Sequence, residues 1–136
     1  MKLRAYLSAS QSIPSKAETL LQLDAETFDT EATFDPTTHR FTPTKPGYYL
    51  ILATVTWYPA TAGRPYDTRI KKNGITIAYG TQVPAADNTA PRVLAHDLAY
   101  LAVDDYIELY VYQGTPVAQN VYGGEDSTFL VIFSVA

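Results

Sequence analysis

Residues Gly47–Tyr58 read GYYLILATVTWY and form the longest β-like stretch of the chain. Successive side chains of a β-strand point to opposite faces of the sheet. One face of this strand is apolar and carries Tyr49, Ile51, Ala53, Val55 and Trp57. The other face carries Tyr48, Leu50, Leu52, Thr54, Thr56 and Tyr58. Because a solvent-exposed face of an antiparallel sheet is normally polar, both faces of this strand are expected to be covered.

Two later segments repeat this two-sided pattern. In the last strand, expected over Ser127–Val135, the residues Leu130 and Ile132 point away from Phe129, Val131, Phe133 and Val135. In the strand before it, Tyr106, Tyr110 and Tyr112 point away from Ile107, Leu109 and Val111. A two-sheet sandwich needs only one apolar face of each strand for its core. The second apolar faces therefore need another cover.

A second copy of the chain is the expected cover for these faces. Each large apolar side chain left in water forfeits about 1.5–3 kcal/mol of burial. A closed ring of identical subunits covers such a sheet and leaves no exposed end. The residues expected at this interface are Tyr48, Leu50, Leu52, Tyr106, Tyr110, Tyr112, Leu130 and Ile132. The alternative is that loops of the same chain cover them.

The composition predicts an all-β protein of one domain, residues 1–136. Hydrophobic residues make up 46% of the chain, and eleven Tyr and five Phe favour half-buried pleated surfaces. Nine Pro and seven Gly divide the chain into short segments, and no apolar stripe keeps helical spacing for three turns. Short strands with frequent turn signals are typical of a sandwich or barrel.

Several function classes are disfavoured by charge and residue content. The net charge is −4, and Lys71-Lys72 is too short a basic run for nucleic acid, so no nucleic-acid partner is expected. The chain contains no Cys, which excludes disulfide scaffolds, Cys-based zinc sites and thiol nucleophiles. The start of the sequence lacks the apolar stretch of a signal peptide, and no segment is long enough for membrane insertion.

Two turns are predicted from local sequence. Asn73-Gly74 lies between Tyr66–Lys72 and Ile75–Val83, and this dipeptide favours a two-residue type I′ hairpin. Val93–Leu101 and Tyr106–Gln113 are expected to pair through the turn at residues 103–105.

The spacing of residues 23–51 resembles the signature of a known family, the globular head of complement component one, subcomponent q, which shares its fold with tumour necrosis factor. The matching pattern is Leu23-x5-Asp29-x4-Phe34-x6-Phe41-x5-Gly47-x-Tyr49-x-Ile51. Leu23 and Ile51 replace aromatic residues of the signature. Lys72-Asn73-Gly74, residues 101–109 and the ending from Gly123-Gly124 to Phe129 also resemble the family, with Asp104 where a Gly is usual.

This resemblance implies a ten-stranded antiparallel jelly-roll sandwich that assembles as a tight homotrimer. The signature residues would be structural and would fill the core; they are Leu23, Phe34, Phe41, Gly47, Tyr49, Ile51 and Phe129. Gly47 would permit a turn or a close approach that a side chain would block. The same signature contains no catalytic residue, so it indicates a fold and not an activity.

The N-terminal half resembles the prokaryotic and phage members of the family. The resemblance rests on Arg4–Ala9, residues 37–41 and residues 47–50. Such members sit on virion fibres, head decorations or bacterial surface proteins. The chain shows no Gly-X-Y tract and no heptads, so we expect either a complete small virion protein or a head cut from a longer one.

No catalytic residues are expected. His96 beside Asp97 is typical of a structural hydrogen bond, and His39 lies next to Arg40. Asp104 and Asp105 are the candidate ligands for calcium, the only cofactor considered, although acidic residues are also common in turns. Trp57 is expected in the core. No phosphate-binding Gly loop or nucleophile elbow is present.

The function predicted from these observations is that of a non-enzymatic virion structural protein. It would act as a capsid decoration, head fibre or tail-fibre tip, as a rigid trimer that meets other virion proteins or a host-surface ligand. The candidate contact loops are Pro59–Pro65, Pro84–Pro91 and Gly114–Asp126. The alternative is a bacterial extracellular module that binds carbohydrate or protein. A hydrolase would need several converging carboxylates, and Glu108 is the only acid inside a strand placed for that.

Overall fold

The computed structural model describes residues 1–136, apart from the side chain of Val83. The described residues form antiparallel strands and turns, and none of them forms an α-helix. The strands are β1 (Lys2–Tyr6), β2 (Gln11–Ile13), β3 (Thr19–Leu20), β4 (Ala25–Asp29), β5 (Phe34–Asp35), β6 (Arg40–Phe41), β7 (Gly47–Thr56), β8 (Pro65–Lys72), β9 (Ile75–Tyr79), β10 (Val83–Pro84), β11 (Arg92–Leu101), β12 (Ile107–Gln113), β13 (Gln119–Val121) and β14 (Phe129–Val135). The described part of the chain has fourteen strands, whereas ten were expected. Four of the fourteen are only two residues long, namely β3, β5, β6 and β10.

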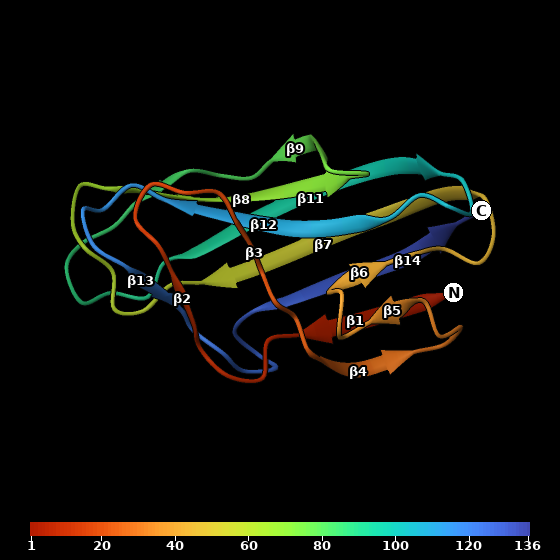
Figure 1. Ribbon diagram of the computed structural model, residues 1–136, viewed down its shortest axis with the longest axis horizontal. Helices are drawn as coiled ribbons and strands as arrows, with labels where there is room; N and C mark the ends of the chain where they lie inside the picture. Colours follow the sequence, from red (N-terminus) through yellow and green to blue (C-terminus); the bar gives the residue numbers. More distant parts are fainter.

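The strands form two large sheets that lie over one another (Figure 1). Sheet I has the order β11-β7-β14-β1-β4. Sheet II has the order β10-β8-β12-β6-β5, with β9 paired to β8 and β3 paired to β12. β2 and β13 form a separate two-stranded ladder. The expectation of an all-β antiparallel sandwich is confirmed.

The core lies between the two sheets and is one continuous cluster of buried side chains. β7 contributes Tyr49, Ile51, Ala53 and Val55 to this cluster, and Trp57 follows with no exposed surface. From sheet II, Ile70 of β8 and Leu109 of β12 meet them. The placement of Trp57 in the core agrees with the sequence prediction.

The hairpin between β8 and β9 has the predicted turn. Asn73 and Gly74 have φ values of 52° and 80°, and positive φ at both positions is the requirement of a type I′ turn. The predicted pairing of residues 93–101 with 106–113 is wrong. β11 pairs with β7 in sheet I and β12 pairs with β8 in sheet II, so the chain crosses between sheets at residues 102–106.

Both termini lie at one end of the sandwich (Figure 1). The connections 59–64, 85–91 and 114–118 lie at the opposite end. The expected loop Gly114–Asp126 contains β13, which pairs with β2 through residues 119–121. Among the described residues there is no helix with the length and hydropathy that a membrane crossing requires.

Candidate functional site

The outer face of sheet I, called the open face below, exposes large apolar side chains. Leu94 and Leu98 on β11 are 52% and 54% exposed, and Leu52 on the neighbouring β7 is 39% exposed. Tyr48, Tyr100 and Val135 continue the same face toward the terminal end of the sheet. The half-buried residues of the open face are Leu50, Phe129, Val131 and Phe133. This face has the composition of an interface rather than of a solvated surface.

The register of sheet I explains why these residues lie together. In antiparallel strands, residues directly opposite one another share a face. Leu94 lies opposite Thr54, His96 opposite Leu52 and Leu98 opposite Leu50. His96 is exposed between the two leucines of β11, and it is not engaged by the adjacent Asp97 in any described hydrogen bond. Tyr48 and Tyr100 form an edge-to-face pair with ring centroids 5.4 Å apart.

Leu130 and Ile132, expected at the subunit interface, lie instead in the core. Both side chains are almost completely buried. Leu130 lies opposite Ala53 and Ile132 opposite Ile51, so both share the inward face of β7. The sequence prediction assigned the two faces of the last strand in reverse, because the one polar residue of the strand, Ser134, shares the inward face with Leu130 and Ile132 and does not mark the outer face.

Phe129, expected in the core, is half-buried on the open face for the same reason. The Arg4 guanidinium lies 4.3 Å from its ring centroid. Arg4 also donates hydrogen bonds to the Thr27 hydroxyl at 2.9 Å and to the Glu125 carbonyl at 2.7 Å. These contacts form a polar rim at the side of the open face where β1 and β4 lie.

An apolar cavity of about 290 Å³ lies on this same half of the open face. Phe28 of β4, which is 44% exposed, forms one wall, and Val131 and Phe133 of β14 form another. The face therefore has two unlike halves. Exposed leucines lie on β11 and β7, whereas an apolar hollow lies between β4, β1 and β14.

The outer face of sheet II, called the capped face below, carries Tyr106, Tyr110 and Tyr112. Each of these rings has a cation against it. Arg40 lies 4.0 Å from the Tyr106 centroid, and Lys71 lies 4.1 Å from that of Tyr110. Arg69 lies 5.1 Å from the centroids of both Tyr112 and Tyr79. Such stacking is favourable, and it covers aromatic surface with groups that water solvates well.

Acidic side chains hold these cations in place. Arg69 pairs with Asp67 at 3.0 Å and with Glu18 at 2.5 Å, and Glu18 also binds Lys71. Partial burial raises the pKa of Glu18, but hydrogen bonds from Lys71 and Arg69 outweigh it and hold that pKa below its usual value. The hydrogen bond to Asp67 raises the pKa of Arg69.

Arg40 pairs with the buried Glu108 at 3.1 Å, and this hydrogen bond raises the pKa of Arg40. The predicted interface residues Tyr106, Tyr110 and Tyr112 thus lie on a different sheet from Tyr48, Leu50 and Leu52. The structure does not bring the two groups onto one surface.

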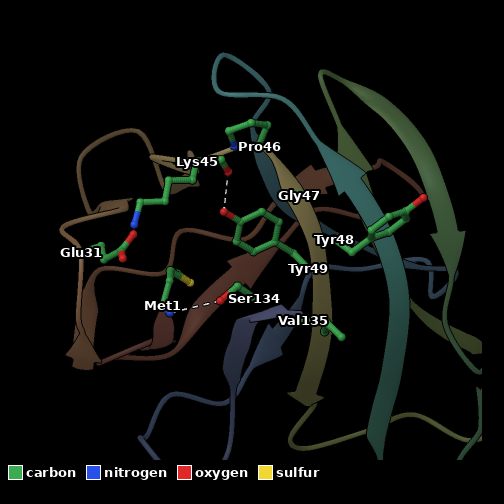
Figure 2. A pocket seen from close by; sticks show the side chains of 9 residues that line it. All are labelled: Met1, Glu31, Lys45, Pro46, Gly47, Tyr48, Tyr49, Ser134 and Val135. Carbon is green, nitrogen blue, oxygen red and sulfur yellow. Dashed lines mark hydrogen bonds between the residues drawn. The ribbon is translucent and has the colours of Figure 1, made fainter.

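A second hollow, of about 200 Å³, lies at the start of β7, close to both ends of the chain (Figure 2). The Tyr49 hydroxyl points into it and donates to the Lys45 carbonyl at 2.6 Å. Burial, together with the nearby Glu31 carboxylate, raises the pKa of Tyr49. Glu31 accepts a hydrogen bond from the Thr44 hydroxyl at 2.6 Å. Tyr48 lies on the other side of β7, toward β11 (Figure 2). These polar groups fasten the turn before β7 and are engaged within the chain.

Gly47 begins β7 at the edge of this hollow. A Cβ there would meet nothing within 4 Å, so close approach is not the reason for glycine. Its φ of 157° is a value that other residues rarely adopt. The other signature residues Leu23, Phe34, Phe41, Tyr49 and Ile51 are buried. Phe41 and Tyr49 form an edge-to-face pair at 5.6 Å.

The two calcium candidates lie at the turn between the sheets. Asp105 accepts hydrogen bonds from the Asn73 side chain and the Ala102 amide, both at 2.8 Å. These bonds, the one from Asn73 above all, lower the pKa of Asp105. Asp104 is exposed. Within the described part of the chain, no three His, Cys, Asp or Glu side chains are grouped so that they could hold a metal ion.

Sequence reasoning missed Leu94, Leu98 and Tyr100 as members of the open face. The signal was present, since residues 94, 96, 98 and 100 alternate with the buried Val93, Ala95 and Leu101. His39 is a structural residue, and its Nδ1 lies 2.7 Å from the Leu23 carbonyl oxygen.

Comparisons with known proteins bear on the fold. No protein-family model and no curated protein sequence matches the chain. Among solved structures, the globular domain of zebrafish complement 1qA protein is similar, with a TM-score of 0.73 and 13% identity over 99% of this chain and 97% of that one. Eiger TNF from S. frugiperda is similar with a TM-score of 0.70 and 9% identity over 100% of this chain and 92% of that one. Murine APRIL (pH 8.0) is similar with a TM-score of 0.70 and 15% identity over 98% of each chain.

These similarities extend over nearly the whole chain, and at such low identity they show the fold alone. The chain has the all-β jelly-roll fold of complement q heads and tumour necrosis factor proteins. The resemblance stated from residues 23–51 is confirmed at this level.

Proposed function

We propose that the chain is a non-enzymatic head that assembles as a homotrimer through the open face. The single observation that carries this proposal is the exposure of Leu52, Leu94 and Leu98 on one sheet. Covering each of them completely would contribute up to about 1.5–3 kcal/mol. An exposed patch of this kind is uncommon on a soluble monomer and typical of an interface.

The two unlike halves of the open face favour a ring over a symmetric dimer. A two-fold interface places the same patch against itself, whereas a head-to-tail contact joins two different patches and can close into a ring. The leucines of β11 form an exposed patch, and the cavity at Phe28 and Phe133 forms an apolar hollow. The leucines of one subunit would occupy the hollow of the next.

The carrier of this head is proposed to be a virion, with the chain as a capsid decoration, head fibre or tail-fibre tip. The support is the resemblance of residues 4–9, 37–41 and 47–50 to phage and prokaryotic members of the family. The placement is therefore outside a cell, on a particle. The alternative carrier is a bacterial surface, where the same head would act as a ligand-binding module.

The end opposite the termini is proposed to make the contacts with a host ligand or with other virion proteins. Three connections gather at that end (Figure 1). A trimer presents each loop three times, so weak contacts add through avidity.

Light scattering coupled to size exclusion tests the trimer. At micromolar concentration the expected mass is three times that of the 15.0 kDa chain. The variant Leu94→Glu places a charge in the centre of the contact, and we expect it to elute as a monomer with its fold retained.

The matched control is Ile75→Glu, which changes an apolar residue that is 71% exposed on β9 of sheet II. This variant should keep the mass of the parent. A monomeric parent chain, or a trimer that tolerates Leu94→Glu and not Ile75→Glu, would refute the proposed assembly.

A further inference from the structure

A third cavity, distinct from the two described above, lies where β7 ends and β11 begins, at the end of the sandwich remote from the termini. Its volume is about 290 Å³. Its lining comes from three separate parts of the chain. The lining residues are Thr56, Tyr58, Ala90, Arg92, Tyr122 and Ser127. Tyr58 adjoins the connection 59–64, Ala90 belongs to the connection 85–91, and Tyr122 directly follows β13. Its volume is near the lower end of the range for ligand pockets, about 300–1,000 Å³, and suits a single ring-sized group.

Two tyrosine rings form one side of this cavity. Tyr58 and Tyr122 are each 46% exposed, and their ring centroids are 5.8 Å apart at an interplanar angle of 79°. In an edge-to-face pair, one ring points its edge at the face of the other. Both faces of the first ring are therefore free of contact with the second ring. Neither ring has a cation against it among the described contacts, unlike the tyrosines of the capped face.

The backbone around these rings is fixed by hydrogen bonds. The Tyr122 amide donates to the Thr56 carbonyl at 2.7 Å, and the Tyr58 amide donates to the Asn120 carbonyl at 3.2 Å. The Thr128 hydroxyl donates to the Tyr122 carbonyl at 2.7 Å. The backbone that carries the rings is therefore fixed before any ligand arrives, which lowers the entropy cost of binding.

Gly123 packs the chain that follows Tyr122 against residues Ala9 and Ser10. A Cβ at Gly123 would lie 2.4 Å from the Ala9 carbonyl carbon, so only glycine allows this approach. The Gly123 amide donates to the Ser10 hydroxyl at 3.1 Å, and the Gly124 amide donates to the Leu7 carbonyl at 2.7 Å. The loop after Tyr122 is thus packed tightly onto the chain.

Arg92 supplies the charge of the cavity. It is exposed, it lies opposite Thr56 in the sheet register, and it forms no ion pair with a described residue. Arg4, Arg40 and Arg69 are each paired with a carboxylate. A guanidinium presents two parallel N–H donors that match a carboxylate, so an unpaired arginine beside a cavity is suited to an anionic ligand.

We infer that this cavity binds an acidic sugar unit, that is, a pyranose ring that carries a carboxylate. The ring would lie against a tyrosine face, and its carboxylate would accept two hydrogen bonds from Arg92. The Ser127 and Thr56 hydroxyls donate to Asp126 and to the Ser127 carbonyl, and both side chains are almost fully buried in the wall of the cavity. This inference rests on the proposed attachment role and names the class of ligand. A ring of three subunits would repeat the site three times.

Titration calorimetry with matched sugars tests the inference. The probes are trigalacturonate, its uncharged methyl ester, and sialyllactose with lactose as its neutral counterpart. We expect binding of at least one acidic sugar and about tenfold weaker binding of its neutral counterpart, as the loss of a charge-assisted hydrogen bond predicts. Which acidic sugar binds distinguishes a uronic acid from a sialic acid as the source.

Four variants locate the site. Arg92→Gln and Tyr122→Ala should each weaken binding about tenfold. Arg64→Gln and Tyr79→Ala are the matched controls, since both residues are exposed and neither lines the cavity. Equal binding of charged and neutral sugars, no binding at millimolar sugar, or full affinity in Arg92→Gln would overturn the inference.

The mass of each sample is measured in parallel. Arg92 and Thr56 lie on the open face together with Leu94, so the cavity borders the proposed contact. Binding is therefore measured for the parent and for Leu94→Glu. If neither protein binds an acidic sugar, the site is overturned and the assembly stays in place. A monomeric parent chain that binds one overturns the assembly and leaves the site in place.

Discussion

The outer faces of the two sheets differ in how their large side chains are covered. On the capped face, Tyr106, Tyr110 and Tyr112 lie under Arg40, Lys71 and Arg69. On the open face, the leucines of β7 and β11 have no such cover among the described residues. Aromatic rings accept cations on their faces, whereas aliphatic side chains gain only from the removal of water. The chain thus covers the tyrosines of one surface by itself and, in the proposed assembly, leaves the leucines of the other for a partner.

The two faces also show that a strand rich in tyrosine and a strand rich in leucine predict different kinds of surface. The sequence predicts that both strands share one interface, because both are apolar on two faces. Cations at Arg69 and Lys71 on the neighbouring strand, opposite Tyr110 and Glu108, distinguish the tyrosine strand. We expect the two faces to respond differently to substitution, as follows.

The largest effect is expected within sheet I, where the two sides of β14 are compared. Ile132→Ala removes a fully buried side chain from the core and should lower the free energy of unfolding by about 2–5 kcal/mol. Val131→Ala, on the open face, should cost less than this in the monomeric chain. Urea denaturation at low protein concentration measures both. Equal losses would contradict the register that places Ile132 inside.

A smaller effect is expected on the capped face. Arg69→Met keeps an apolar stem over Tyr79 and Tyr112 but leaves the buried Asp67 carboxylate without its partner. We expect a loss of about 1–3 kcal/mol in the free energy of unfolding. Adding Asp67→Asn to this variant should restore part of the loss, which thermal unfolding would show. No recovery in the double variant would mean that Asp67 is not the reason for the loss.

The smallest effect is expected at Glu18, and it depends on pH. The pKa of Glu18 is lowered in the folded state, so its contribution is present above its ordinary value near 4.5 and is lost as the pH falls through the lowered pKa. Glu18→Gln should therefore be less stable than the parent at neutral pH by about 0.5 kcal/mol. The difference should vanish in acid. Denaturation curves across this range measure it, and a difference that persists in acid would point to packing instead of charge.

Much of the fold could be predicted from local sequence. The turn at Asn73-Gly74 needs positive φ at two positions, and that requirement is visible in two letters of the sequence. The spacing from Leu23 to Ile51 indicated the jelly roll through its resemblance to a family signature, and five residues of that spacing fill the core: Leu23, Phe34, Phe41, Tyr49 and Ile51. The two-residue strand β5 depends on its pairing with β6 and leaves no such pattern.

The site was harder to predict because strand partners are set at long range. Leu130 and Ile132 are as apolar as Val131 and Phe133, so only pairing with β7 decides which pair faces inward. β11 and β12 follow one another in the sequence, which predicts a hairpin, but they belong to different sheets. The cavity at Tyr58, Arg92 and Tyr122 joins residues far apart in the chain and has no sequence motif.

The position of the termini has a practical consequence. Both chain ends lie at one end of the sandwich, while three connections lie at the other (Figure 1). A biotinylation tag genetically joined to either end would anchor the molecule on a sensor chip with those connections directed toward the flowing solution. The same geometry would let the head be grafted onto a new stalk without rebuilding the surface that meets the analyte.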